Sequence, residues 1–297
     1  MVVTPTDCDA REQTTIARPA SVRGFGYWSG EDVRVELCPA EPGTGVVFVR
    51  TDLALPCRIF SRVENRVDVP RRTNLHENGE RVEMVEHVLA ALAGLQVDNC
   101  EVRVDAPEMP GCDGSSRAYV NEILTAGIVS QGVPCQQLTI TDVVRVGDER
   151  TWVEARPVTT GRLHVRCRID YGPQSAIGEQ FVELNVTPQS FQRELADCRT
   201  FILRKEAELL RSQGLGARTS YRDLLVFDER GPIQNTLRYD NECARHKALD
   251  LVGDLALAGF DLIGMFIANC SGHRLNAELV QTLLEKHAVP RCCRMSA

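Results

Sequence analysis

The chain has 297 residues, of which 43% are hydrophobic and 25% are charged. This supplies enough apolar surface for one large domain or two medium ones. A net charge of −7 without any basic run argues against nucleic acid as a partner. No stretch approaches the ~18 apolar residues of a membrane span, and the N-terminus lacks the apolar core of a signal peptide. We therefore expect a cytoplasmic protein.

Twelve cysteines are scattered along the chain, and none belongs to a CxxC pair. This spacing argues against a structural zinc knuckle. A chain of this length does not need disulfides for stability, so the cysteines are expected to be reduced thiols, many of them small buried side chains.

The first group of elements has strands early and helices late. Residues 1–15 are polar and are expected to be disordered. The first domain is expected over 16–132, and residues 128–136, at the junction with the second domain, are expected to form a linker. Apolar spacing and turn residues predict its elements: strands within 16–60, a helix over 83–95, a strand over 99–106 and a helix that starts after Ser115 or Ser116.

The second group repeats that order, and a second domain is expected over 133–288, with a loose tail over 289–297. Its predicted strands cover 138–146, 162–170, 179–186 and 260–268, and its predicted helices cover 205–213, 240–254 and 275–288. No repeat is visible at the level of individual residues. The fold class is therefore expected to be α+β, with two domains that each layer a sheet against helices.

The helix predicted over 240–254 carries polar side chains at regular spacing. His246, Asp250 and Asp254 are each four residues apart, which places them along one helical face. An imidazole and a carboxylate one turn apart have Cβ atoms roughly 5–6 Å apart, close enough to bind one metal ion. Lys247 adds a cation beside them. The alternative is a solvated face with a Lys or Arg partner.

A second pair, Glu86 and His87, lies inside an otherwise apolar helix. Burying an acid and an imidazole is costly unless they are paired or bound to a metal. The alternative is a Glu–His pair on a partly exposed face. His273 lies between a strand and a helix, where catalytic groups often occur, although a loop histidine is more often only exposed to solvent.

Taken together, these side chains indicate a catalytic zinc site. His87, His246 and Asp250 provide the three protein ligands of a zinc hydrolase, and Glu86 is a candidate general base. The ligand set suits Fe(II) as well as Zn(II). The remaining histidines, at positions 76, 164 and 287, are not assigned to the site.

Five ordered motifs carry a resemblance to a known family: VEHVLAALAGLQVDN (85–99), APEMPGCDGSS (106–116), CRTF (198–201), RHKALDLVGDLALAG (245–259) and SGHRLN (271–276). With these motifs the chain resembles the UDP-3-O-acyl-N-acetylglucosamine deacetylases, the zinc amidases of the committed step in lipid A synthesis. The resemblance extends from Ser21 to His287. It implies two α+β domains with the active site between them.

The resemblance also implies roles for individual residues. His87, His246 and Asp250 would hold the zinc ion. Glu86 would act as general base on the attacking water, and Lys247 would stabilise the oxyanion.

In the same family pattern, Thr200 would donate a hydrogen bond to the tetrahedral intermediate. His273 would protonate the leaving amine, and Asp254 would orient His273 and favour its charged form. The substrate contacts implied by the resemblance are Phe201, Asp170, Tyr171, Ser220 and Gly272.

The implied partner is a UDP-linked acylated amino sugar, and the protein is expected to be a monomer with at most peripheral membrane contact through the acyl chain. Trp28 and Cys270 depart from the family pattern, which has a His and often a Lys there. They motivate an alternative, a related zinc amidohydrolase acting on a different N-acyl amino sugar. An alternative of another class is a non-catalytic metal-binding paralogue.

Overall fold

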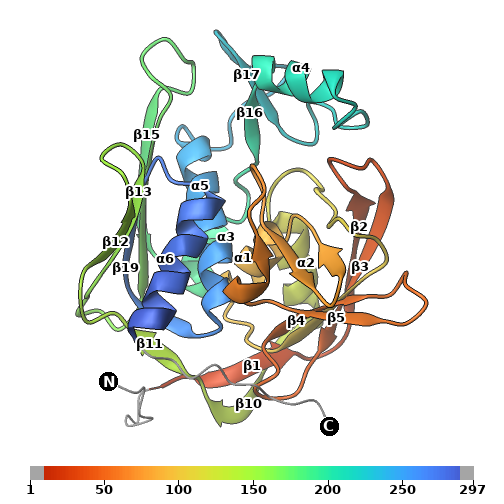
Figure 1. Ribbon diagram of the computed structural model, residues 1–297, viewed down its shortest axis with the longest axis vertical. Helices are drawn as coiled ribbons and strands as arrows, with labels where there is room; N and C mark the ends of the chain where they lie inside the picture. The colour runs from red at the N-terminus through yellow and green to blue at the C-terminus, as the bar shows by residue number, and fades with distance from the viewer. Residues whose placement is uncertain (1–9, 288–297) are drawn as a thin grey trace.

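The computed structural model describes residues 10–287. Two large mixed sheets enclose a central layer of helices, with one sheet on each side in Figure 1. The predicted α+β class is confirmed. Among the described residues, no helix is long and apolar enough to cross a membrane.

The first large sheet has the strand order β2-β3-β9-β4-β5. Helices α1 (Glu86–Gly94) and α2 (Arg117–Ala126) belong to the same half of the chain. The strands are β2 (Ala20–Phe25), β3 (Asp32–Pro39), β4 (Val46–Arg50), β5 (Cys57–Phe60) and β9 (Cys100–Val104).

The second large sheet has the order β12-β13-β19-β14-β15, with β11 paired to β19. Helices α5 (Glu242–Leu255) and α6 (His273–Lys286) pack on it. The strands are β11 (Gln137–Thr139), β12 (Val144–Gly147), β13 (Trp152–Arg156), β14 (Leu163–Asp170), β15 (Glu179–Asn185) and β19 (Asp261–Asn269).

Both sheets are built with the same connectivity. Apart from β11, which precedes the second set and has no counterpart in the first sheet, four strands come first, then a helix, a strand that inserts at the centre of the sheet, and a second helix. The inserted strand is antiparallel to one neighbour and parallel to the other: β9 to β3 and β4, and β19 to β13 and β14. The topology therefore repeats although the residues show no repeat.

Each repeat carries an insertion immediately before its first helix. The first insertion contains β6 (Arg66–Val67), β7 (Asn74–Glu77) and β8 (Glu80–Val82), preceded by the 3-10 turn Val63–Asn65. The second is longer and contains α3 (Pro188–Glu194), β16 (Phe201–Leu203), α4 (Arg204–Ser212), β17 (Leu225–Asp228) and β18 (Gly231–Pro232). Both insertions contribute side chains to the cavity described below.

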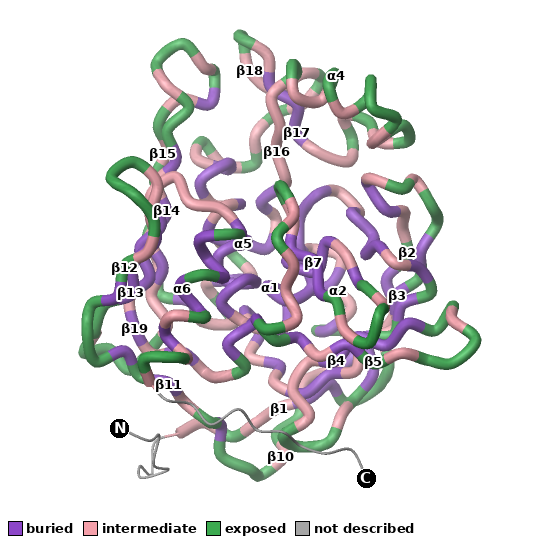
Figure 2. Tube along the Cα trace, in the orientation of Figure 1, coloured by how far each residue is buried: buried purple, intermediate pink, exposed green. Residues whose placement is uncertain are grey.

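Helices α1 and α5 form the buried centre of the molecule, as Figure 2 shows. Both are rich in Ala and Leu, which favour helix and leave room for close approach. At the crossing, Gly253 of α5 faces the backbone of α1: a Cβ added there would lie 2.2 Å from the Glu86 carbonyl oxygen. The helix pair therefore requires glycine at this position.

The structure corrects two expectations about irregular segments. Disorder was predicted through residue 15, but β1 (Glu12–Ile16) pairs antiparallel with β10 (Ile128–Pro134), which occupies most of the predicted linker. β1 (EQTTI) is largely polar, and Gly132 and Pro134 give β10 (IVSQGVP) the composition of a linker, so neither segment gave a clear strand signal. The predicted boundary between 132 and 133 lies within β10, and the two-domain division stays a prediction. Residues 1–9 and the predicted tail over 289–297 lie outside the described part of the chain.

Replacing Gly253 with alanine tests the helix crossing. Alanine is intrinsically better than glycine in a helix by about 1 kcal/mol, but overpacking against the α1 backbone costs about 1–3 kcal/mol. Because the atoms it meets at Glu86 and Ala90 are backbone, we expect Gly253→Ala to lower the free energy of unfolding, measured by urea denaturation. A more stable variant would contradict the close approach of α1 and α5.

Candidate metal centre

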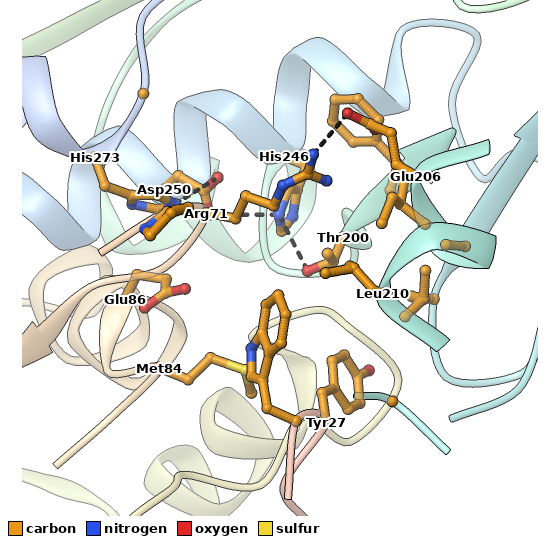
Figure 3. Close-up of a pocket in the computed structure, with 18 of the residues that line it drawn as sticks. Tyr27, Arg71, Met84, Glu86, Thr200, Glu206, Leu210, His246, Asp250 and His273 are labelled. Atoms are coloured by element: carbon orange, nitrogen blue, oxygen red, sulfur yellow. Dashed lines mark hydrogen bonds and ion pairs between the residues drawn. The ribbon is translucent and has the colours of Figure 1, made fainter. Parts of the chain in front are cut away.

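The three predicted ligands converge at the crossing of α1 and α5. His87 lies in the first turn of α1, and His246 and Asp250 are one turn apart on α5. One potential ligand atom from each lies within 4.8 Å of the others. The Nε2 atoms of His87 and His246 are 3.8 and 3.3 Å from Asp250 Oδ1. Figure 3 shows His246, Asp250 and Glu86 beside one another at the same cavity.

The protonation states of these three side chains suit a cation. Burial and the neighbouring His246 lower the pKa of His87 to about 3. Burial also lowers the pKa of His246. Burial opposes ionisation of Asp250, but His246 and Lys247 hold the pKa of that carboxyl well below its usual range. Two neutral imidazoles and one carboxylate are therefore presented together, the ionisation states that metal binding requires.

One oxygen of the site has no protein partner. Asp250 Oδ1 is buried and accepts no hydrogen bond, whereas Oδ2 accepts from Lys247 Nζ at 2.7 Å. A buried carboxylate oxygen without a partner is costly. This oxygen faces both Nε2 atoms, so a metal ion bound by all three side chains would satisfy it. The residues present therefore fit a metal.

Glu86 is buried next to this group. Its Oε2 accepts a hydrogen bond from the Thr73 backbone N–H at 3.0 Å. Burial raises the pKa of Glu86 to about 7, although nearby His273 lowers it. A carboxyl that exchanges its proton near neutral pH is well matched to general base catalysis.

The His273 ring pairs with the buried carboxylate of Asp254. His273 is the first residue of α6, and its Nδ1 lies 2.9 Å from Asp254 Oδ2. Asp254 also accepts from Thr73 Oγ1 at 2.6 Å and from Asn276 Nδ2 at 2.8 Å. Burial lowers the pKa of His273, but the attraction of Asp254 outweighs it and raises the pKa to about 9. The imidazolium is therefore the form present at neutral pH.

Lys247 and Thr200 complete the polar side of the site. Burial lowers the pKa of Lys247, but Asp250 outweighs this and keeps the ammonium charged. The Thr200 hydroxyl donates to the Gly114 carbonyl at 3.0 Å and lies 3.2 Å from His246 Nε2. One cation and one hydroxyl thus lie beside the three potential ligands.

A cavity of about 920 Å³ opens in front of these residues. Four of the five predicted substrate contacts line this cavity: Phe201, Tyr171, Ser220 and Gly272. The ring of Phe201 lies 5.8 Å from that of Tyr171. Asp170, the fifth, does not line the cavity; its carboxylate pairs with Arg168 at 2.8 Å and accepts from the Gly172 N–H at 2.9 Å.

The structure adds residues that the sequence analysis did not assign. Thr73 bridges Glu86 and Asp254, and nothing in its local sequence marks it. Asn276 lies three residues after His273, so the helical spacing could have placed it on the same face. Arg71 and Glu206 form an ion pair of 2.7 Å between residues that line the cavity, from the first insertion and from α4 (Figure 3).

The Asp254→Asn variant tests the His273 pair. Removing the Asp254 charge should lower the pKa of His273 by about 1–3. Burial, which lowers this pKa, remains, while the attraction of the Asp254 carboxylate, which raises it, is lost. NMR titration of the His273 ring in the metal-free protein measures this. The control is Glu278→Gln. Glu278 is an exposed acid on the same helix and pairs with Arg274, so its loss should leave the pKa of His273 unchanged. An equal pKa in Asp254→Asn and the native protein would exclude the pairing.

Comparisons with known proteins identify the family of the chain. The family model described as LpxC, UDP-3-O-acyl N-acetylglycosamine deacetylase, matches residues 13–285. A relative from Haemophilus influenzae (strain PittEE), named UDP-3-O-acyl-N-acetylglucosamine deacetylase, is 40% identical over 92% of this chain and 90% of its own length. Relatives of the same name from Myxococcus xanthus (strain DK1622) and Oleidesulfovibrio alaskensis (strain ATCC BAA-1058 / DSM 17464 / G20) are 38% and 37% identical.

The alignments with the Myxococcus and Oleidesulfovibrio relatives each cover 92% of this chain, and they cover 86% and 89% of the relatives' own lengths. The matched range contains both helices of the candidate centre and both insertions. The predicted resemblance is confirmed, and the chain belongs to the UDP-3-O-acyl N-acetylglycosamine deacetylase family, a family of amide-hydrolysing enzymes.

Proposed function

We propose that the protein is a zinc-dependent deacetylase that removes the N-acetyl group from UDP-3-O-acyl-N-acetylglucosamine, releasing acetate and the free amine in lipid A synthesis. The observation that carries the zinc dependence is the unpartnered, buried Asp250 Oδ1 within reach of two neutral imidazoles. The substrate follows from family membership and from the names of the relatives.

His87, His246 and Asp250 would hold the zinc ion, which when bound would act as a Lewis acid toward the attacking water and the amide carbonyl. Fe(II) is the alternative metal for this ligand set. The other residues then act around the amide. Glu86 takes a proton from the attacking water while the water oxygen forms a bond to the carbonyl carbon. Lys247 stabilises the negative charge that develops on the carbonyl oxygen, and the Thr200 hydroxyl does so once it rotates its hydrogen away from the Gly114 carbonyl.

The tetrahedral intermediate then collapses by breaking the C–N bond. His273, charged at neutral pH, gives its proton to the departing nitrogen, so that the leaving group is a neutral amine. Asp254 keeps the imidazole oriented and charged for this step. The two proton-transfer groups thus have separate roles because their environments move their pKa values apart.

We expect a bell-shaped pH profile. Glu86 must be deprotonated, so activity should fall below about pH 7; His273 must be protonated, so activity should fall above about pH 9. Glu86→Gln and His273→Gln should each reduce kcat by about 10²–10⁴-fold, and each should remove its own limb from a steady-state pH profile. A retained alkaline limb in His273→Gln would exclude His273 as the proton donor.

Loss of a ligand should abolish metal binding and turnover together. His87→Ala and Asp250→Ala are expected to lose stoichiometric zinc, measured by elemental analysis, and to lose deacetylation. Glu206→Gln is the control for zinc content, which it should retain, because it changes a carboxylate that lines the cavity outside the ligand set. Near-native turnover in either alanine variant would show that the ligands are misassigned.

A related amidohydrolase with another amino-sugar substrate stays a second candidate, since Trp28 and Cys270 both line the cavity. Assaying the UDP-linked substrate beside the same sugar without UDP separates the two, and equal rates would favour the second. The non-catalytic alternative predicts that the purified protein binds zinc but hydrolyses no acetamide.

We also propose a reducing compartment, the cytoplasm, and a monomeric protein. The nine cysteines within the described residues are all free thiols, and six of them are buried. Thiols in this state are typical of reducing compartments.

A further inference from the structure

The strip Cys198–Thr200 contacts the candidate metal centre at two points. His246 Nδ1 lies 3.0 Å from the Cys198 carbonyl oxygen. Because a carbonyl only accepts, Nδ1 carries the hydrogen and Nε2 is left free to bind a metal. Two residues later, the Thr200 hydroxyl lies 3.4 Å from His87 Nε2 and 3.2 Å from His246 Nε2.

Arg199, between these two contacts, forms a buried ion pair with Glu242. Its Nε donates to Glu242 Oε1 at 2.8 Å and its Nη2 donates to Oε2 at 3.0 Å. The Arg199 backbone N–H also donates to Oε1 at 3.1 Å. Glu242 is 0% exposed and Arg199 is 7% exposed. The side chain and the main chain of Arg199 are thus both attached to one carboxylate.

Further hydrogen bonds hold the pair in place. Glu242 Oε2 accepts from the Arg238 backbone N–H at 2.7 Å. Arg199 donates to Asn235 Oδ1 at 2.8 Å and to the Thr236 carbonyl at 2.7 Å. Each carboxylate oxygen therefore has two donors, and the guanidinium plane is fixed at both ends.

The location of Glu242 connects this network to the ligands. Glu242 and His246 are four residues apart on α5 and lie on one face of the helix. Successive turns of α5 therefore hold Arg199 and the Cys198 carbonyl. A buried ion pair adds little net stability over apolar packing of similar shape, whereas its directional bonds fix an orientation.

We propose that the Arg199–Glu242 pair positions the metal centre: it fixes the Cys198 carbonyl on His246 and the Thr200 hydroxyl beside both imidazoles. This inference rests on the proposed function, since it assigns the pair a role toward the metal. Neither residue lines the cavity or belongs to the candidate ligand set, so both are positioning residues that act through His246 and Thr200. Partners that orient a ligating histidine are typically worth about 10–100-fold in metal affinity.

The test uses Co(II) as a spectroscopic substitute for zinc in the full-length protein. Glu242→Gln keeps the size of the side chain, and Arg199→Lys keeps the charge but loses the planar fork. Each variant should bind Co(II) about 10–100-fold more weakly in competition with a chelator, and its visible absorption bands should shift. In the metal-free protein, NMR of the ring nitrogens should show His246 as the Nδ1–H tautomer natively and as a mixture in the variants.

The matched control is Arg50→Lys. Arg50 is also a buried arginine, 3% exposed, paired with Asp52 at 2.6 Å, and it does not line the cavity. This variant should lose stability and keep the native Co(II) affinity and spectrum. Should Glu242→Gln not fold, Arg199→Lys carries the same test.

The outcomes separate the two claims. A native protein that binds no Co(II) or zinc would overturn the proposed function. A native protein that binds Co(II), with variants that match its affinity, spectrum and tautomer, would overturn only the positioning role.

Discussion

The structure depends on the close crossing of α1 and α5. Gly253 brings the helix backbones together at Glu86, and the same crossing buries His87 against His246 and Asp250. Apolar side chains of both helices belong to one continuous core. Polar groups in such a place are unfavourable unless each has a partner. Nearly all of these groups have one, and the buried Asp250 Oδ1, which has none, faces the two imidazoles.

The repeated topology explains where the chemistry lies. Each half provides the same sheet and helix pair, and the first helix of each half meets the other at the molecular centre. The site itself is not symmetric, because the two insertions differ. The first supplies Thr73 behind Glu86, and the second supplies the Cys198–Thr200 strip along α5. The shared framework positions the three proposed ligands, and the insertions supply much of the cavity wall.

Much of the site was predictable because its residues lie on helices with regular spacing. His246, Asp250 and Asp254 share a helical face, and Glu86–His87 interrupts an apolar helix, so both signals are local. Thr73 and the Arg199–Glu242 pair were not assigned because their roles depend on contacts between segments far apart in the chain. Strands β1 and β10 were missed for the same reason: each forms by pairing with a segment more than a hundred residues away in the chain. Asp170 was assigned as a substrate contact from the family pattern alone, and in the structure its carboxylate pairs with Arg168.

X-ray absorption at the zinc edge of the purified protein tests the central claim most directly. With twelve cysteines in the chain, thiolate is the main competing ligand, and zinc–sulfur bonds of about 2.3 Å differ clearly from zinc–nitrogen or zinc–oxygen bonds of about 2.0–2.2 Å. We predict one zinc ion per chain with only the shorter distances and the signature of two imidazoles. Sulfur neighbours, or a protein that retains no zinc, would contradict a centre built from His87, His246 and Asp250.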